Sequence, residues 1–460
     1  MSNFLEKFGN IVSQVDGFVW GPVMIIFLLG THIFLTWRTG FIQKDVFRGI
    51  KYSLKKDGSK KGDLSIFGSL MTALSSTVGT GNIIGVGTAV ALGGAGAVLW
   101  TWIGGIFGIA TKYAESYIAV KYRRKNADGT YIGGAMTAFE HLGLKPMAII
   151  FAVLAALAAF GIGNATQANA IVDIVSSNYN ISATIVGIVL VVLVGVVVFG
   201  GIKSISKVCE RLVPVMAIVY IVGCLVILGI NIRFIPQTFL AIVQNAFTGR
   251  AVYGGLIGTV VIQTIRYGVA RGLFSNEAGM GSAPMATAAG QANNAVKPAL
   301  VGSTGVFWDT VVICLLTGLV LVSSVIANPG ISIADVAGKG TDLVSLCFGQ
   351  IPYVGVPLLV FGIITFSYST ILGWSYYGET CFKYLFGVKY VKIYQALWVI
   401  ITFVGAVGSL NIVWDIADIL NALMCIPNVI AVLMLSKQMW KDTKYYLPEE
   451  HIDEEDPEIQ

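Results

Sequence analysis

The sequence predicts an all-α integral membrane protein with about eleven transmembrane helices. Of its 460 residues, 55% are hydrophobic and only 12% are charged, whereas globular domains carry roughly 25% charged residues. The apolar residues gather in runs, such as 18–35 and 184–201, that are about as long as the ~20 residues a helix needs to cross a bilayer. A soluble core accounts for one such run but not for so many.

The apolar spans follow one another along most of the chain and form a single predicted domain, 1–445. We expect one extra N-terminal helix at 18–37. Ten further spans follow it, at 64–92, 96–120, 146–175, 183–202, 212–231, 250–276, 299–326, 353–382, 391–409 and 413–436. The stretch 446–460 is acidic, and we expect a disordered cytoplasmic tail there, a plain solvated end rather than an interaction tail.

Basic residues in the connecting segments indicate on which side each loop lies. Alternate segments are rich in lysine and arginine, namely 38–63, 121–125, 203–211, 383–392 and 437–444. The opposite set carries few basic residues, Lys7, Arg233, Arg250 and Lys339. Because positive residues mark the cytoplasmic face, we expect the amino terminus outside the cell and the carboxyl terminus inside it, in the plasma membrane.

This orientation relates two halves of the chain. The second span runs from inside to outside, and the seventh, five spans later, runs in the opposite direction. The segments 64–231 and 250–436 are therefore expected to form a five-plus-five inverted repeat, as in secondary transporters. In such repeats, discontinuous helices form the substrate site near the bilayer midplane. We expect the first and sixth core helices to be the broken ones.

The segment 75–82, SSTVGTGN, is the expected first break. Gly79 and Gly81 each cost a helix up to ~1 kcal/mol against alanine. Backbone freed at that depth persists only inside the protein or beside water, and its carbonyls, with the neighbouring hydroxyls, are ligands for a small hard cation. Near Thr80 and Gly81 the next half-helix would direct free N–H groups at a carboxylate. A helix-packing face of small residues would explain the glycines and serines but not Asn82.

Other polar residues lie within apolar spans. Asp309 lies near the centre of its span, so it either contributes to a cation site or pairs with Arg266 or Arg271. Asn164 and Gln167 are three residues apart and share one helix face. They bind either the amino group of a substrate or each other.

Four segments resemble the alanine or glycine:cation symporter family, also called the sodium:alanine symporters. They are TVGTGNIIGVGTAVALGGAGAVLWTWIGGIFGIATKYAE at 77–115, GIGNATQANAI at 161–171, RGLFSNEAGMGSAPMATAAG at 271–290 and FWDTVVIC at 307–314. The resemblance implies the five-plus-five fold of the bacterial leucine transporter with one extra helix in front. It also implies sodium-driven import of a small neutral amino acid such as alanine, glycine or D-alanine.

The resemblance further implies two cation sites. The Asn82 side chain and the Thr77 carbonyl would bind the sodium ion next to the substrate, with Asp309 as a further candidate. A second sodium would be bound by the carbonyls of Ser75 and Val78 and by two hydroxyls of the eighth core helix, Ser369 and Thr370.

The implied substrate site uses the Thr80 and Gly81 amides for the carboxylate. Trp374 follows Thr370 by one turn, so it either caps a pocket that fits only a methyl side chain or anchors its helix at the membrane interface. The remaining candidates for this site are Asn164, Gln167, Phe366, Gln263 and Thr264, the last two from the expected second break. Glu277 is expected at the cytoplasmic end of the seventh span, as a gate or loop-structuring residue.

Three alternatives remain at this point. A proton-coupled permease on the same fold would use Asp309 as its proton carrier. A channel would need a repeated pore-lining ring, and no filter-like element recurs. An enzyme has least support, because no nucleophile–base pair or metal-ligand cluster is visible. We therefore expect no covalent cofactor and no nucleic-acid partner, only sodium, a small amino acid and the lipid bilayer.

Overall fold

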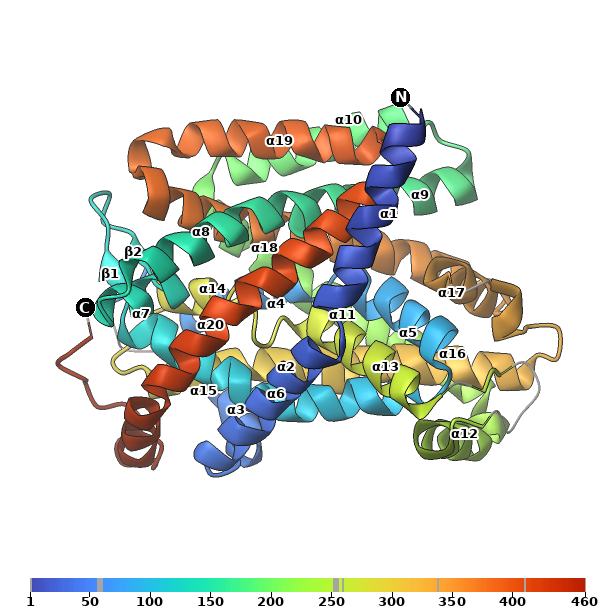
Figure 1. Cartoon of the computed structure of the whole chain (residues 1–460), viewed down its shortest axis with the longest axis horizontal. Coiled ribbons are helices and arrows are strands. Elements are labelled where there is room, and N and C mark those ends of the chain that lie inside the picture. The colour runs from blue at the N-terminus through green and yellow to red at the C-terminus, as the bar shows by residue number, and fades with distance from the viewer. Residues whose placement is uncertain are drawn as a thin grey trace.

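The computed structural model describes residues 2–55, 61–250, 256–258, 260–336, 339–408 and 411–459. Most of them are helical, and most helices run along the long axis of the molecule (Figure 1). The short strands β1 (Arg124–Lys125) and β2 (Tyr131–Ile132) lie at one end with the carboxyl terminus, whereas α12 and α17 lie at the other end.

The helices have the following bounds. The first half contains α1 (Ser2–Val19), α2 (Pro22–Arg38), α3 (Val46–Ser53), α4 (Ile66–Thr77), α5 (Val86–Gly93), α6 (Ala97–Lys121), α7 (Ala135–His141), α8 (Lys145–Phe160), α9 (Thr166–Tyr179), α10 (Ala183–Val198) and α11 (Gly201–Ile230). The second half contains α12 (Ile235–Thr248), α13 (Val261–Asn276), α14 (Pro284–Ala289), α15 (Val296–Val306), α16 (Leu315–Ala327), α17 (Gly340–Gly349), α18 (Gly355–Phe386), α19 (Val391–Val407) and α20 (Asn411–Tyr446).

Wider π-helical turns join three pairs of these helices. They are Gly81–Gly85 before α5, Gly161–Ala165 between α8 and α9, and Phe307–Cys314 between α15 and α16. Each coincides with a segment that carries polar candidate residues. Single-turn π-bulges of this kind are frequent at functional sites.

Seven helical stretches of the described residues are long and apolar enough to span a membrane. They are Gly9–Arg38, Lys145–Tyr179, Gly201–Ile230, Val296–Ala327, Gly355–Phe386, Val388–Val407 and Trp414–Tyr446. Shorter apolar helices occupy Ile66–Thr77, Gly81–Gly93 and Ala183–Val198. This pattern is that of a multi-pass membrane protein.

Some helix boundaries differ from the expected ones. The helix α11 begins at Gly201 rather than at 212, because the basic segment 203–211 continues the helix and Pro214 is accommodated within it. The structure also shows α1, which was not expected, running beside α20 (Figure 1). Residues 251–255 and 259 of the expected span 250–276 lie outside the described residues, as do Lys56 and Lys60 of the first basic loop.

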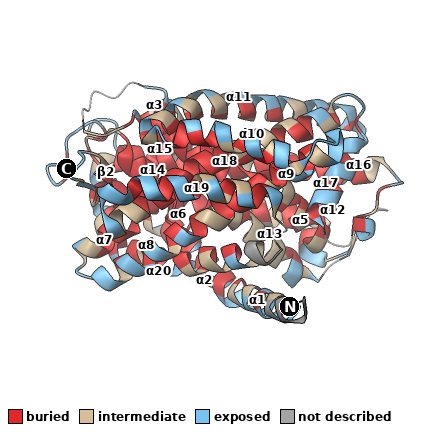
Figure 2. Ribbon diagram, turned by 90° about the horizontal axis from the view of Figure 1, so that it is seen from above, coloured by how far each residue is buried: buried red, intermediate tan, exposed pale blue. Residues whose placement is uncertain are grey.

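Burial separates an inner group of helices from an outer shell (Figure 2). Side chains of α4, α6, α14 and α15 are mostly buried, whereas α10 and α19 expose many apolar residues. On α10, Val196 is 75% exposed, and Ile185 and Val189 are exposed as well. An apolar outer surface on these helices is suited to contact with lipid.

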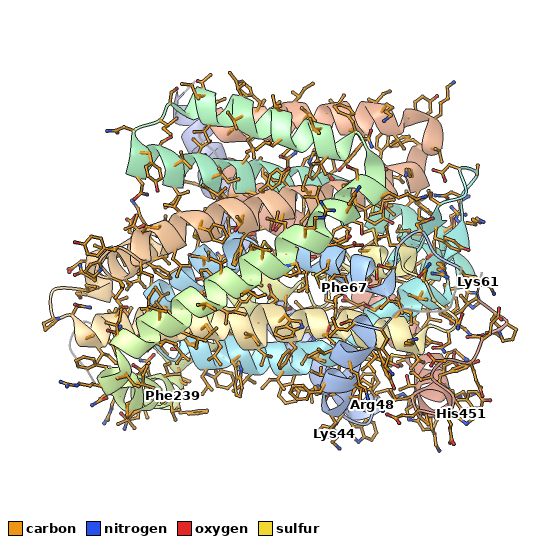
Figure 3. The ribbon with its side chains drawn as sticks, turned by 180° about the vertical axis from the view of Figure 1, so that it is seen from behind. Lys44, Arg48, Lys61, Phe67, Phe239 and His451 are labelled. Atoms are coloured by element: carbon orange, nitrogen blue, oxygen red, sulfur yellow. The ribbon has the colours of Figure 1, made fainter. Side chains whose placement is uncertain are left out.

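The acidic tail does not match the expectation of a disordered end. Lys121 Nζ lies 2.7 Å from carboxylate oxygens of both Asp456 and Glu458, and Asp456 is itself buried. Ile452 and Ile459 are buried too. Figure 3 shows His451, in the tail, at the same end of the molecule as Lys61 and Arg48. The expectation is therefore wrong, because the basic residues of this end attract the acidic tail and apolar contacts hold it in place.

Candidate substrate and cation site

The first interruption lies between α4 and the π-turn that precedes α5, as the sequence predicts. α4 ends at Thr77, and Val78 adopts an extended conformation with φ −77° and ψ 91°. The Gly79 N–H donates to Asn82 Oδ1 at 2.8 Å. A Cβ on Gly79 would lie 2.5 Å from Thr370 Oγ1. A side chain there would displace the Thr370 hydroxyl, because α18 passes directly against the broken segment.

The second interruption lies between α13 and α14. Three residues of this loop have positive φ: Glu277 (54°), Gly279 (101°) and Gly281 (76°). The break was expected near Gln263 and Thr264, but both residues belong to the first turn of α13, and Gln263 is exposed. That placement is wrong because the glycines that tolerate left-handed backbone lie further along, in the EAGMG segment.

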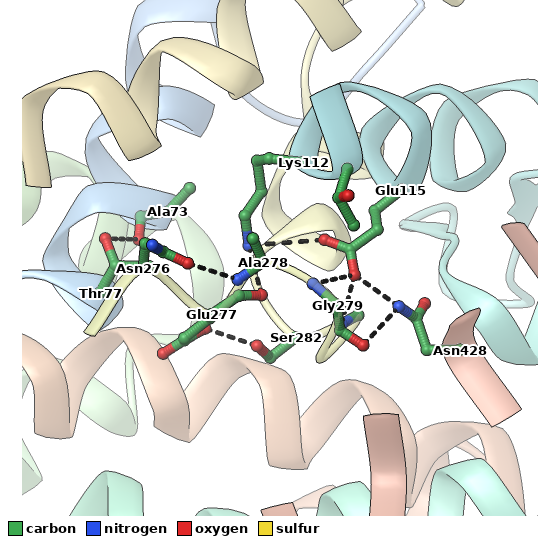
Figure 4. Close-up of polar contacts among 12 residues, drawn as sticks. Ala73, Thr77, Lys112, Glu115, Asn276, Glu277, Ala278, Gly279, Ser282 and Asn428 are labelled. Carbon is green, nitrogen blue, oxygen red and sulfur yellow. Dashed lines mark hydrogen bonds and ion pairs between the residues drawn. The ribbon is translucent and has the colours of Figure 1, made fainter. Parts of the chain in front are cut away.

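Buried side chains from α6 and α20 satisfy the backbone of this second loop (Figure 4). Glu115 Oε1 accepts two of its N–H groups, at 2.8 and 3.1 Å. Asn428 Nδ2 donates to the same oxygen at 2.5 Å. Lys112 Nζ donates to the backbone carbonyl of Glu277 at 2.7 Å and lies 3.6 Å from Glu115 Oε2. These contacts offset the cost of unpaired backbone groups in a membrane interior.

Lys112 and Glu115 were not expected as site residues. A signal was present, because the two residues are opposite charges three positions apart within one apolar span. Intramembrane charges of this kind are functional candidates by default. Their partners in the loop, 164 to 166 residues away, become visible only in the folded chain.

Asp309 and Asn82 lie together in the first cation site that the resemblance implies. Asn82 Nδ2 donates to Asp309 Oδ1 at 2.7 Å. Asp309 Oδ2 accepts from Ser275 Oγ at 2.9 Å and from Thr310 Oγ1 at 2.7 Å. These three donors are neutral, so a cation bound here would offset the charge of the carboxylate.

The alternative partners of Asp309 lie elsewhere. Arg271 Nη1 lies 3.7 Å from Asp418 Oδ2 on α20. Arg266 Nη2 donates to the Gly17 carbonyl of α1 at 3.3 Å. Both arginines line a cavity of about 230 Å³ beside α1. The structure therefore contradicts an ion pair between Asp309 and either arginine.

The residues of the second implied cation site meet in two hydroxyl–carbonyl pairs. Ser369 Oγ donates to the Ser75 carbonyl at 3.1 Å, and Thr370 Oγ1 donates to the Val78 carbonyl at 3.3 Å. All four residues are buried. Within the described part of the chain, no three His, Cys, Asp or Glu side chains cluster as a metal site. The two implied sites offer neutral oxygens and the carboxylate of Asp309, and such ligands suit an alkali cation rather than a transition metal.

A cavity of about 20 Å³ lies between the two interruptions. Such a volume holds about one water molecule. Its walls are formed by both interruptions, by the π-turn before α9, and by α4, α9, α13, α18 and α20. The lining residues are Ser76, Thr77, Gly79, Gly81, Ile162, Gln167, Phe274, Glu277, Met280, Thr370, Trp374 and Asn421. The cavity therefore adjoins both candidate cation sites.

Trp374 and Glu277 form one wall of this cavity. Trp374 is only 2% exposed, and its Nε1 donates to Glu277 Oε1 at 2.8 Å. A Cβ on Gly163 would lie 2.2 Å from Trp374 Cβ, so α18 packs tightly against the π-turn before α9. The indole is thus part of the core and not an interfacial anchor. Glu277 follows the last residue of α13, at the helix end where we expected it, and it also lines the cavity.

The structure separates the other substrate candidates. Gln167 lines the cavity, and its Nε2 donates to Thr80 Oγ1 at 3.1 Å. Asn164 instead donates to the Trp398 carbonyl and accepts from Thr402, each at 2.8 Å, so both of its amide atoms bond to α19. The two side chains therefore face different neighbours.

Phe366 and Phe274 are placed differently from expectation. Phe366 packs against Tyr220 with ring centroids 5.1 Å apart and does not belong to the cavity lining. Phe274, which the sequence analysis missed, lines the small cavity and also a larger one of about 750 Å³. That larger cavity is bordered by α9 and α17, at the end of the molecule opposite the carboxyl terminus (Figure 1).

Comparison with known proteins extends over the whole chain. The model of the sodium:alanine symporter family matches residues 5–460. The sodium/alanine symporter AgcS of Methanococcus maripaludis is 45% identical over 452 residues, which cover 95% of this chain and 97% of AgcS. The amino-acid carrier protein AlsT of Bacillus subtilis is 33% identical over 454 residues, which cover 97% of this chain and 93% of AlsT.

Solved structures of other transporters share the fold. MhsT in complex with L-phenylalanine has a TM-score of 0.59 at 16% identity, over 83% of this chain and 89% of that chain. A sodium-coupled sialic acid symporter in an outward-open state has a TM-score of 0.51 at 12% identity, over 94% of this chain and 88% of that chain. The resemblance seen in the sequence is confirmed, and the chain belongs to the sodium:alanine symporter family.

Proposed function

We propose that this protein imports a small neutral amino acid, alanine, glycine or D-alanine, together with sodium by alternating access across the plasma membrane. The observation that carries the proposal is the pair of interrupted helices with candidate cation ligands beside them. The cavity of about 20 Å³ between them is smaller than an amino acid, so its walls must separate when the substrate binds. The name of the relative AgcS, a sodium/alanine symporter, supports the same substrate pair.

In the proposed site, the Thr80 and Gly81 amides bind the substrate carboxylate at the start of the π-turn. One sodium binds near Asn82, Thr77 and Asp309, beside that carboxylate. Charges of opposite sign in a dry site stabilise one another. Sodium and amino acid therefore bind cooperatively, and each raises the affinity of the other by the same factor.

The second sodium binds between α4 and α18, at the Ser75 and Val78 carbonyls and the Ser369 and Thr370 hydroxyls. Occupation of this site would replace the two hydroxyl–carbonyl hydrogen bonds by cation contacts. Because its ligands come from two different helices, the ion couples its own binding to the relative position of α4 and α18.

The proposed architecture has eleven spans in one domain, 1–445. The helix 18–37 precedes two inverted repeats, 64–231 and 250–436, with the amino terminus outside and the carboxyl terminus in the cytoplasm. The paired interruptions after α4 and α13 support the repeat. The large cavity at the end opposite the basic loops supports an opening toward the outside.

Purified protein in proteoliposomes tests the function. An inward sodium gradient should drive uptake of labelled alanine, and replacement of external sodium by choline at fixed pH should abolish it. Undiminished uptake without sodium would contradict the proposal, and uptake driven by a pH gradient alone would favour the proton-coupled alternative. Saturable counterflow of labelled alanine would distinguish a carrier from a channel.

A further inference from the structure

We propose that the carboxylate of Glu277 binds the ammonium group of the transported amino acid. Glu277 would then determine specificity for an α-amino group. This inference rests on the proposed function, since it assigns a role within the same site. It adds a substrate-binding residue to the backbone amides and sodium ions that bind the opposite end of the substrate.

Glu277 is placed at the cavity by the backbone that follows α13. Its left-handed conformation, with φ 54°, ends the helix and turns the chain into the loop. The side chain is 3% exposed and lines the same small cavity as Thr77 and Gly81. Figure 4 shows its carboxylate directed away from Lys112 and toward Ser282.

Among the described residues, the Glu277 carboxylate has two side-chain hydrogen-bond donors but no cationic side chain within ion-pair distance. Trp374 Nε1 donates to Oε1 at 2.8 Å and Ser282 Oγ donates to Oε2 at 2.5 Å. Both donors are neutral, and an ionised carboxylate has about four lone-pair positions. Two positions therefore remain for an additional donor, and a charged donor would offset the cost of a buried negative charge.

The nearest buried lysine is already engaged. Lys112 pairs with Glu115 at 3.6 Å and reaches Glu277 only through its backbone carbonyl. Asp309 lies in the first cation site. The two buried carboxylates nearest in this network thus have other counterparts, since Glu115 pairs with Lys112 and Asp309 would bind the sodium of the proposed first site. We assign the substrate ammonium as the counterpart of Glu277.

The two charged groups of an α-amino acid match the groups that face each other across this cavity. Its carboxylate and ammonium groups are separated by a single carbon atom. A site that binds the carboxylate at the Gly81 wall therefore needs an acceptor for the ammonium within the same small cavity. Glu277 is the carboxylate among the residues that line it.

The alternative is that Glu277 only orients Trp374 and supports the loop. The two roles are separated by comparing L-alanine with L-lactate, in which a hydroxyl group replaces the ammonium at nearly the same size. Competition against labelled alanine is measured on the full-length protein in proteoliposomes, both in sodium and in choline. The readout is the ratio of the two inhibition constants.

We expect wild-type protein to prefer alanine over lactate by about tenfold to a hundredfold, the effect of one hydrogen bond to a charged group. Glu277→Gln keeps the size and an oxygen that accepts from Trp374, and it should bring the ratio close to one. Ser282→Ala removes a neutral donor but keeps the charge, so its ratio should stay near that of wild type.

Two results would overturn the inference. One is an unchanged ratio in Glu277→Gln, and the other is an equal loss of affinity for alanine and lactate, which a purely structural role predicts. If Glu277→Gln does not fold, wild-type protein that binds lactate as tightly as alanine overturns it too. If wild-type protein binds alanine equally well in sodium and in choline and still prefers it over lactate, the result counts against the proposed function and not against Glu277.

Discussion

Buried polar side chains connect the interrupted segment after α4 to its neighbours. Asn82 accepts from the Gly79 N–H and donates to Asp309, so one amide joins the first break to the π-turn between α15 and α16. Trp374 joins α18 to the second break through Glu277. At the scale of residues, one substitution should change sodium binding and another should change the size of the substrate that is accepted.

Asn82→Ala should weaken sodium and alanine binding together, each by roughly tenfold or more, because it removes a ligand from a shared charged site. Alanine binding titrated at several sodium concentrations measures both. Asn164→Ala is the matched control, since Asn164 is equally buried but bonds to α19. A change in alanine affinity without any change in its sodium dependence would contradict the shared site.

Trp374→Phe should enlarge the cavity and admit larger substrates. The relative affinity for 2-aminobutyrate, one methylene larger than alanine, should rise by about fourfold, the value of one buried methylene. Competition against labelled alanine measures the change. Trp398→Phe serves as control, because Trp398 is buried against Phe160 and Tyr394 and away from the cavity. Unchanged selectivity in Trp374→Phe would show that the indole does not limit substrate size.

At the scale of elements, the site depends on the close approach of α4 and α18. The candidate second cation site takes two carbonyls from one helix and two hydroxyls from the other. The helices approach closely because Gly79 and Gly373 lack side chains at the contact. Cores packed this tightly transmit small displacements rather than absorb them.

Gly373→Ala should therefore weaken sodium coupling. Its Cβ would lie 2.7 Å from Ser75 Oγ and 2.8 Å from the Ser76 nitrogen, which forces α18 away from α4. We expect the sodium concentration for half-maximal uptake to rise by about tenfold. Gly229→Ala in α11 is the control, because a Cβ there meets no atom within 4 Å. Equal behaviour of the two variants would show that the helix contact is not critical.

At the scale of the whole molecule, the carboxyl-terminal tail joins segments that are distant in sequence. It bonds to the end of α6 through Lys121 and to the start of α15 through Lys297, whose Nζ lies 2.7 Å from Asp453 Oδ1. Asn294 Nδ2 donates to the carbonyls of Ile452 and Glu454, each at 2.9 Å. The tail thus covers the end of the molecule that carries the basic loops.

Lys121→Ala should lower the free energy of unfolding by about 3–5 kcal/mol, because it leaves the buried Asp456 without its cation. Lys61→Ala should cost about 0–1 kcal/mol, because the pair of Lys61 with Glu455 is largely exposed and screened by solvent. Thermal unfolding of both variants in detergent measures the difference. Equal stability of the two would mean that the docked tail contributes little.

Local features of the chain made much of this predictable. Apolar runs, basic loops and the SSTVGTGN segment are properties of neighbouring residues, so they indicated a multi-pass helical protein and the position of the first break. The second break was misplaced at Gln263 and Thr264, because the glycines that form it lie in a segment that also resembles a loop at a helix end. The tail was expected to be disordered because its acidic composition alone predicts a solvated segment, whereas in the structure it binds basic residues of distant segments.

The sequence by itself determined the environment of the protein, its family resemblance and the residue types available for cations and a carboxylate. Only the tertiary structure decided which of these residues meet. Asn164 and Gln167 share a helix segment, yet one bonds to α19 and the other lines the cavity. Glu277, Lys112 and Glu115 become one network because α6 and the second break are adjacent in space. The physical reason is that a helix face acquires a role only from the helix packed against it.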